Sequence, residues 1–173
     1  MKYIILMLLL ASSITQAATH YFVRHAEKDH SNPANRNPDL TLKGQQRAQN
    51  LALLLSQADI KHIHSTDYIR TEQTALPLSE VLKLPINHYD PSDMSNFLTQ
   101  LKANPENSLV VGHSNTTTEA VSFITGKNME GLSEDDYGDV FQVIIEGKVI
   151  SINHLKLAPA ADKPEAHQDI KTI

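Results

Sequence analysis

The sequence predicts an α/β protein in which helices cover both faces of a mostly parallel, mixed central sheet, a three-layer α/β/α arrangement. Two observations carry this prediction. Short apolar runs alternate with longer segments of helical periodicity along most of the 173 residues, and the last two apolar runs are separated by a Glu-Gly turn. Alternation favours a parallel sheet between helices, whereas a closing hairpin adds antiparallel strands. Hydrophobic residues make up 40% of the chain, which suffices for one core in one domain.

The first half of the domain alternates strand, helix, strand, helix and strand. Prolines and asparagines predict a loop over 29–39. Pro77 lies in the second helix, and we expect its first turns to be irregular or its start to be late. The expected elements are a strand over 20–24, a helix that opens at 40–43, a strand over 60–65, a helix over 71–84 and a short edge strand over 85–88. The first helix should bury Ala48, Leu51, Ala52, Leu54 and Leu55, which follow helical spacing.

The second half ends in a hairpin. An apolar run of Leu and Val predicts a buried strand over 108–112, and Gly126 is a plausible cap for the helix that follows. An acidic loop over 127–139 then leads to the hairpin. The expected elements are a helix over 92–102 that places Met94, Phe97, Leu98 and Leu101 on one side, the strand over 108–112, a helix over 116–125, and hairpin strands over 140–146 and 148–154. We therefore expect one domain over 18–155 and a disordered tail, rich in Ala, Pro, Lys and Asp, over 156–173.

Residues 1–17 have the pattern of a secretory signal peptide. Lys2 supplies a positive start, an apolar run follows to Ala11, and small residues lead to Ala17. The run is well short of the roughly 20 residues that span a bilayer, so it does not favour a membrane anchor. We expect cleavage after Ala17, with cleavage after Ala18 as the alternative. Export across the cytoplasmic membrane, to a bacterial periplasm, follows as an expectation.

The composition excludes several classes of function. The chain has no cysteine, which excludes disulfides, thiolate metal sites and a cysteine nucleophile. A net charge of −5 and the absence of tryptophan argue against a nucleic-acid surface. No glycine-rich phosphate loop with its lysine occurs, so a nucleotide kinase is not favoured.

Three predicted strands lead into segments that carry arginine or histidine. The first ends in Arg24 and His25, the second is followed by Arg70 near a helix start, and the strand over 108–112 is followed by His113. In parallel α/β sheets the carboxyl ends of the strands meet at one edge, where ligands bind. We therefore expect two arginines and two histidines to converge there, beside helix N-termini that favour anions.

Such a cluster suits phosphoryl transfer. Guanidinium groups match phosphate oxygens and neutralise the charge that develops on them. A neutral imidazole is a competent nucleophile toward phosphorus and forms a phosphohistidine, which water then cleaves. A second histidine can hold a further phosphate oxygen. The arginines supply the positive charge, so no metal or other cofactor is expected.

Four segments, which together cover about residues 20–125, resemble the motifs of the histidine phosphatase superfamily. Arg24-His25-Ala26-Glu27 is similar to its Arg-His-Gly signature, with Ala in place of Gly. The other three are 40–48, similar to its Leu-Thr-x-x-Gly-x-x-Gln-Ala helix, 65–75, similar to its second-arginine segment, and 110–116, similar to its second-histidine segment. The resemblance implies that His25 is the nucleophile and that Arg24, Arg70 and His113 hold the phosphate.

The residue that protonates the leaving group is left open between two aspartates. A leaving alkoxide needs a proton in the transition state. One branch of the family uses an aspartate directly after the second histidine, but this chain has Ser114 there. The other uses a glutamate between the second arginine and the second histidine, where this chain offers Asp90 and Asp93. We favour Asp90 as the proton donor. The structural alternatives are that Asp90 only forms a turn before Pro91 and that Asp93 only stabilises the start of a helix.

Two other functions compete with a phosphatase. His62 and His64 alternate on one strand face with Asp67 nearby, which resembles a His-x-His-x-Asp zinc motif with the aspartate one residue too far. A zinc-dependent hydrolase is therefore one alternative, and a phosphate-binding module without catalysis is another. Two features argue against a mutase, another activity of the family that the motifs resemble. Lys28 stands where many members have Ser or Thr, which does not suit a mutase-like substrate pocket, and the segment between Leu84 and Ser108 leaves little room for the lid that a mutase needs. The sequence thus favours a phosphatase for small phosphorylated substrates.

Overall fold

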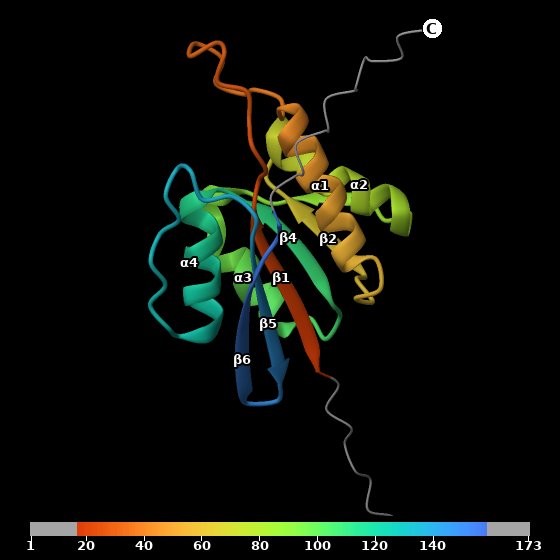
Figure 1. The fold of residues 1–173 in the computed structure, drawn as a ribbon. Helices are drawn as coiled ribbons and strands as arrows, with labels where there is room; N and C mark the ends of the chain where they lie inside the picture. The colour runs from red at the N-terminus through yellow and green to blue at the C-terminus, as the bar shows by residue number, and fades with distance from the viewer. Residues whose placement is uncertain (1–16, 159–173) are drawn as a thin grey trace, which may run out of the picture.

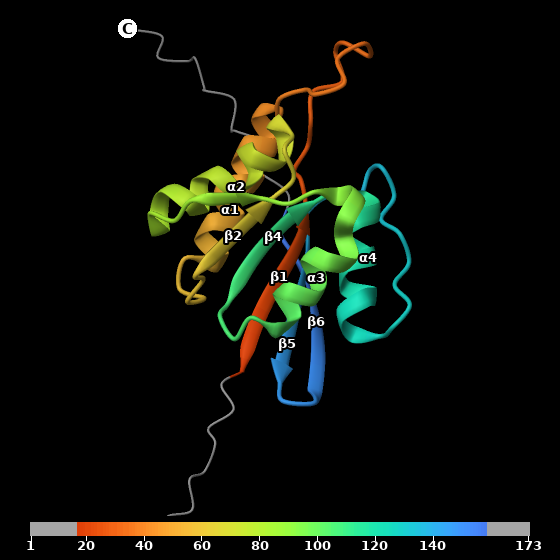
Figure 2. The same cartoon turned by 180° about the vertical axis from the view of Figure 1, so that it is seen from behind.

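The computed structural model describes residues 17–158, which form a six-stranded sheet between two pairs of helices (Figures 1 and 2). The strand order is β3-β2-β4-β1-β5-β6, with parallel pairing from β3 to β1 and antiparallel pairing of β5 and β6. The predicted three-layer α/β/α fold with a mixed sheet is confirmed. The strands are β1 (Ala18–Arg24), β2 (His62–Ser65), β3 (Ile86–His88), β4 (Ser108–Gly112), β5 (Asp139–Glu146) and β6 (Val149–Lys156). The helices are α1 (Leu42–Leu55), α2 (Ile69–Leu82), the 3₁₀ turn η1 (Pro91–Asp93), α3 (Met94–Ala103) and α4 (Ser114–Thr125).

The two faces of the sheet bury separate cores. In β1, Tyr21 and Val23 belong to the core beneath α1 and α2, whereas Phe22 belongs to the core beneath α3 and α4. This alternation follows because successive side chains of a strand point to opposite faces. On the first face the sheet meets Leu51 and Leu55 of α1 with Ala75 and Leu78 of α2, and on the second it meets Leu98 and Leu101 of α3 with Val121 and Ile124 of α4.

Helix α1 starts and buries its face largely as predicted. The Thr41 hydroxyl accepts a hydrogen bond from the backbone N–H of Gly44 at 3.0 Å and so caps the first turn. Leu54 is a correction, because its side chain was expected in the core and is 46% exposed. The buried face of α1 is a narrow stripe that contains Leu51 and Leu55, which are four residues apart and so lie on the same side of the helix. Leu54 lies at the edge of this stripe.

Pro77 does not disturb the first turns of α2, so that prediction is wrong. The helix begins at Ile69 and runs continuously through Pro77 to Leu82. Proline lacks the N–H that would bond to the carbonyl of Gln73, which costs the helix one hydrogen bond. Ala75 and Leu78, on either side of Pro77, are fully buried against the sheet. Their packing holds the helix across the missing bond.

The parallel pairing of β1 and β4 brings two of the predicted strand tips together. Arg24 lies opposite Gly112 in the ladder, and the backbone N–H of His25 donates to the Gly112 carbonyl at 2.9 Å. Strand β2 pairs with the other side of β4, with Ser65 opposite Val111. The carboxyl ends of β1, β4 and β2 therefore share one edge of the sheet, as the sequence predicts.

The ends of the described chain differ slightly from the predicted domain limits. Strand β6 continues to Lys156, and the N–H of Leu157 donates to the Gly138 carbonyl at 2.7 Å, so the packed domain extends beyond residue 155. The remainder of the predicted tail, 159–173, and the predicted signal peptide up to residue 16 lie outside the described residues. Within residues 17–158, none of the helices combines the length and apolar character needed to cross a membrane.

Neutral histidines lie in the core beneath α3 and α4. His20 of β1 and His62 of β2 both lie opposite Ser108 of β4, so they share one row across the sheet. His20 is 0% exposed, and among the described residues neither of its ring nitrogens has a hydrogen-bond partner. Burial lowers the pKa of His20 to about 4 and that of His64 to about 4.

We expect the free energy of unfolding to fall as the pH is lowered from about 6.5 to about 4. Between the pKa of folded His20, about 4, and the ordinary value of 6.5, the unfolded chain binds more protons than the folded protein. The stabilisation is fully present above pH 6.5, and His20 alone should account for about 3 kcal/mol of the loss. Urea unfolding at pH 7.5, 5.5 and 4.5 measures it. His20→Asn should flatten the pH dependence, whereas His30→Asn, in an exposed loop, should not; equal slopes for the wild type and His20→Asn would refute the assignment.

Candidate active site

The four residues that the sequence assigned to phosphate chemistry gather at the carboxyl edge of the sheet. His25 follows β1 and His113 follows β4, and their ring centroids lie 5.6 Å apart. Arg70, in the first turn of α2, places Nη2 3.4 Å from Nδ1 of His113. Arg24, at the end of β1, has a side chain that is only 2% exposed. The predicted convergence of two arginines and two histidines is therefore present in the structure.

His25 is held as a neutral imidazole with a defined tautomer. Its Nδ1 lies 2.8 Å from the Ala26 carbonyl, which can only accept, so Nδ1 carries the proton and Nε2 keeps the lone pair. Burial, and secondarily the charges of Arg70 and Arg24, lower the pKa of His25 to about 3. A nucleophilic nitrogen is therefore available without prior deprotonation over the physiological pH range.

His113 is held by Arg70 on one side and by a threonine pair on the other. Because a guanidinium can only donate, Nδ1 of His113 accepts from Arg70, and Nε2 then donates to the Thr66 hydroxyl at 3.1 Å. Thr66 in turn bonds to the Thr71 hydroxyl at 3.0 Å. Burial, followed by the charges of Arg70 and Arg24, lowers the pKa of His113 to about 4. The second histidine is therefore also neutral in the free protein.

Arg24 anchors the loop between α4 and β5. Its Nη1 donates to the backbone carbonyls of Ser133, Glu134 and Asp136 at 2.7, 3.1 and 3.0 Å. Its Nη2 lies 3.2 Å from the carboxylate of Glu134. A planar guanidinium can make several such bonds at once, so this one side chain fixes the loop over the site. The sequence predicted a phosphate-holding role for Arg24 but not this structural one.

Each arginine also stacks on a tyrosine that borders a histidine. The guanidinium of Arg24 lies 4.4 Å from the ring centroid of Tyr137, and that of Arg70 lies 4.5 Å from the ring of Tyr68. Tyr137 lies 6.3 Å from the His25 ring and Tyr68 lies 5.1 Å from the His113 ring. The site therefore contains two Arg-Tyr-His groups, whose histidine rings lie 5.6 Å apart.

The arginines retain donors for a ligand. Arg24 Nε, Arg70 Nε and Arg70 Nη1 are buried and have no hydrogen-bond partner within residues 17–158. Buried N–H groups left unpaired are costly, and charged donors more so, which suggests that an acceptor binds here in the working protein. Burial lowers the pKa of Arg70, but an arginine remains protonated at physiological pH. An oxyanion is the kind of acceptor that charged guanidinium donors favour.

Asp90 does not join this cluster. One of its carboxylate oxygens accepts from the N–H and the hydroxyl of Ser92 at 2.8 and 2.7 Å, so it caps η1, and these bonds lower the pKa of Asp90. Asp93 directly precedes α3, and its carboxylate accepts from Asn96. Asp90 borders an open pocket of about 450 Å³ that it shares with Tyr68. Asp90 thus has the turn role, and Asp93 the helix-start role, that the sequence offered as structural alternatives to proton donation.

Glu134 and Tyr137 are the site residues that the sequence did not identify. They lie in the acidic loop over 127–139, for which the sequence predicted no site residue, and they reach Arg24 across more than 100 residues of sequence. The second oxygen of Glu134 lies 3.4 Å from the hydroxyl of Ser114, the residue after His113. Neither residue belongs to a periodic pattern or a motif, so the only available signal was the acidity of the loop.

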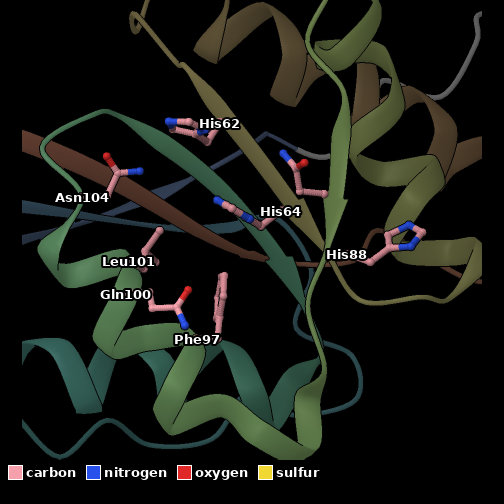
Figure 3. Close-up of a pocket in the computed structure, with 8 residues that line it drawn as sticks. His62, His64, His88, Phe97, Gln100, Leu101 and Asn104 are labelled. Carbon is pink, nitrogen blue, oxygen red and sulfur yellow. The ribbon is translucent and has the colours of Figure 1, made fainter.

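His62 and His64 face a different pocket, which lies between the sheet and α3 (Figure 3). Its volume is about 530 Å³, and imidazole, carboxamide and aromatic side chains line it. His62 Nε2 lies 2.7 Å from a Glu106 oxygen, and the His64 ring meets Phe97 edge-on at 5.2 Å. No arginine or lysine is among the lining residues, so this pocket offers no fixed charge for a phosphate.

Asp67 lies apart from these two histidines. Within residues 17–158, the group of side chains whose geometry could hold a metal ion is Asp67, Glu72 and His88, and this group includes neither His62 nor His64. His88 already pairs with Glu72 at 2.6 Å and turns toward α2 in Figure 3. The structure therefore does not assemble the His-x-His-x-Asp set that the zinc alternative requires.

Glu27 joins the nucleophile segment to α1. Its carboxylate receives two parallel bonds from Arg47, at 2.6 and 2.8 Å, and these bonds outweigh burial and lower the pKa of Glu27. Its carbonyl accepts from the N–H of Thr41 at 2.9 Å. Gly44 packs against the same carbonyl so closely that a Cβ there would lie only 2.2 Å from it. Helix α1 is therefore fixed against the residues that directly follow His25.

The comparisons with known proteins agree with this geometry. Residues 20–91 match the family described as the histidine phosphatase superfamily (branch 1), a segment that contains Arg24, His25 and Arg70 but ends before His113. Among curated proteins, none matches the sequence. The matched segment, 72 of the 173 residues, makes the first half of the domain similar to this superfamily.

Several solved structures share the fold at low sequence identity. The protein histidine phosphatase SixA, complexed with tungstate, is 16% identical with a TM-score of 0.66, covering 80% of this chain and 96% of its own. YhfR of Bacillus stearothermophilus is 14% identical with a TM-score of 0.65, covering 78% and 95%. A mycobacterial glucosyl-3-phosphoglycerate phosphatase is 14% identical with a TM-score of 0.59, covering 74% and 90%. At these identities the likeness shows the fold alone.

Gly44→Ala should destabilise this protein, although a glycine-to-alanine change at an exposed position of a helix usually stabilises a protein. The new methyl group would lie 2.2 Å from the Glu27 carbonyl, so α1 or the segment after His25 must move. Overpacking of this kind costs about 1–3 kcal/mol, more than the roughly 1 kcal/mol that alanine gains over glycine in a helix. Chemical denaturation measures the change. Gln46→Ala, on the exposed side of α1, is the control; a Gly44→Ala protein as stable as the wild type would contradict the proposed contact.

Proposed function

We propose that this chain is a phosphatase that hydrolyses small phosphomonoesters or phosphoramidates through a phosphohistidine on His25. The observation that carries the proposal is a neutral imidazole with Nε2 unprotonated, buried beside two arginines that retain unpaired N–H groups. An imidazole lone pair beside donors for an oxyanion is what attack on a phosphoryl group requires.

The proposed reaction has two steps. In the first, Nε2 of His25 attacks phosphorus and the bond to the leaving group breaks, while Arg70 and Arg24 neutralise charge on the non-bridging oxygens. The hydrogen bond from Nδ1 to the Ala26 carbonyl stabilises the positive charge that the imidazole gains. In the second, water attacks the phosphohistidine and releases phosphate, which restores the neutral ring. His113 borders the same space and would hold a phosphate oxygen.

The match to the histidine phosphatase superfamily supports the proposal without specifying the substrate. The matched segment includes three of the four residues used in these steps. Two of the structural neighbours are a protein histidine phosphatase and a glucosyl-3-phosphoglycerate phosphatase, which differ in substrate. The arginines supply the positive charge in our mechanism, so it requires no metal ion.

A phosphate-binding module without catalysis is the second candidate. One observation favours it: the loop carbonyls already occupy Nη1 of Arg24, which leaves this arginine fewer donors for a transition state than Arg70 has. Such a module would bind phosphate without breaking a covalent bond. Detection of the covalent intermediate separates the two candidates.

Base-quenched wild-type protein should carry a phosphoryl group on the peptide that contains His25. Phosphohistidine is labile in acid and stable in base, so mass spectrometry after a rapid alkaline quench of a p-nitrophenyl phosphate reaction detects it. His25→Ala should abolish both the label and turnover, whereas phosphate should still bind, because Arg24, Arg70 and His113 remain.

The matched control is the double variant His62→Ala with His64→Ala, which alters the other histidine pair. It should retain the label and the activity, and exhaustive treatment of the wild type with a chelator should leave turnover unchanged. Phosphate binding without label or turnover would favour the binding module. Activity that a chelator removes and zinc restores, in a protein active without His25, would replace this mechanism by the zinc alternative.

We propose that the chain is exported, which rests on the pattern of residues 1–17. Strand β1 begins at Ala18, which is buried and pairs with Ile145 of β5. Cleavage after Ala17 would preserve this strand, whereas cleavage after Ala18 would remove its first residue. Mass spectrometry of protein from its native host should therefore find a mature N-terminus at Ala18. Soluble protein that retains Met1 would contradict export.

A further inference from the structure

The loop that Arg24 anchors brings a carboxylate to the edge of the site. One oxygen of Glu134 lies 3.2 Å from Arg24 Nη2 and the other lies 3.4 Å from the Ser114 hydroxyl in the first turn of α4. Within residues 17–158, Glu134 is the carboxylate that bonds to Arg24 or to the residue after His113. Its side chain is 73% exposed, so it can change its position while the backbone of its loop stays bound to Arg24.

The position of Glu134 is one that suits an anion. A guanidinium and the start of a helix both favour negative charge, so the carboxylate occupies an environment that a phosphate oxygen would also favour. The negative charge of Glu134 also acts against the lowering of the Arg70 pKa by burial. A phosphate bound to Arg24 would lie beside the carboxyl group of Glu134, which contacts the same guanidinium.

We propose that Glu134 is the proton donor to the leaving group and the base for the attacking water, an inference that rests on the phosphatase function proposed above. It would fill the role for which the sequence suggested Asp90. A carboxyl group that lies beside the bound phosphate can deliver a proton where negative charge develops, which is the requirement for a general acid.

The proton and the electron pairs balance over the two steps. As the His25 nitrogen forms its bond to phosphorus, the bond from phosphorus to the leaving oxygen breaks, and that oxygen takes the proton of Glu134 and leaves as an alcohol. Glu134 is then a carboxylate. It accepts a proton from water as the water oxygen bonds to phosphorus and the bond to nitrogen breaks. Phosphate and the neutral imidazole result, with Glu134 protonated again.

Two other groups fit this role less well. The carboxylate of Asp90 is tied by Ser92 into the cap of η1, and its hydrogen bonds within residues 17–158 reach no arginine or histidine of the site. Tyr137 reaches His25, but burial raises the pKa of its phenol, so it holds its proton more tightly than an ordinary tyrosine does. Glu134 is a carboxylate in contact with both Arg24 and Ser114.

The test measures kcat/KM for p-nitrophenyl phosphate, phenyl phosphate and glycerol 2-phosphate, in order of increasingly basic leaving groups. Glu134→Gln keeps the size of the side chain but cannot donate the proton. It should reduce kcat/KM about 10²–10⁴-fold for glycerol 2-phosphate and only a few-fold for p-nitrophenyl phosphate, whose leaving group is already a stable anion. The variant should also lose the alkaline limb of the pH profile for glycerol 2-phosphate.

Asp135→Asn is the matched control, because it removes the same charge from the neighbouring exposed position of the same loop. It should leave all three substrates within a few-fold of the wild type, and so should Asp90→Asn. Equal losses on all three substrates in Glu134→Gln, or tighter phosphate binding with undiminished turnover, would overturn the inference and make Glu134 only an internal competitor of phosphate. A selective loss in Asp90→Asn would return the role to Asp90.

Failure of this inference is distinguishable from failure of the phosphatase proposal. A wild type that labels His25 and hydrolyses p-nitrophenyl phosphate but not glycerol 2-phosphate would overturn only the role of Glu134, since no acid would then act on a basic leaving group. A wild type that hydrolyses none of the three substrates and carries no label on His25 would overturn the phosphatase proposal and this inference together.

Discussion

The site depends on the in-register parallel pairing of β1 with β4. Arg24 lies opposite Gly112, and the N–H of His25 extends the ladder by one bond to the Gly112 carbonyl. The residues that follow, His25 and His113, are thereby placed side by side. Because side chains alternate along a strand, a slip of one residue would move Phe22 and Val23 into the wrong cores and separate the histidines. The burial that stabilises the sheet thus also fixes the chemistry at its edge.

The sheet and its polar edge could be predicted because local signals agreed. Phe22 and Val23 run directly into Arg24 and His25, and Leu109 to Val111 run into Gly112 and His113. Buried parallel strands have no other local reason to end in such residues, and the edge rule for α/β sheets brings the ends together. The places where prediction failed have tertiary causes: packing of Ala75 and Leu78 overrides Pro77, and Leu54 falls just outside the buried stripe.

The remainder of the site could not be predicted, because it depends on a loop without periodicity. Residues 133–137 acquire their positions from bonds to Arg24, whose partner atoms are mostly backbone carbonyls and therefore leave no trace in residue type. The sequence favoured Asp90 as the proton donor because of its place in the chain, between the second arginine and the second histidine. In the structure the Asp90 carboxylate instead accepts its hydrogen bonds from Ser92, two residues away. Sequence order predicts which residues follow a strand, but not which distant loop folds back over them.

The tyrosine rings stacked on Arg24 and Arg70 have a consequence for how an anion can reach each arginine. A phenol ring covers one flat face of each guanidinium at about the distance of ordinary ring contact. The N–H edge is the other route, and at Arg24 the loop carbonyls and Glu134 already occupy Nη1 and Nη2. Arg70 keeps two unpaired nitrogens, Nε and Nη1, against one, Nε, at Arg24. The two arginines are thus alike in residue type but unequal in the edge that they leave to an anion.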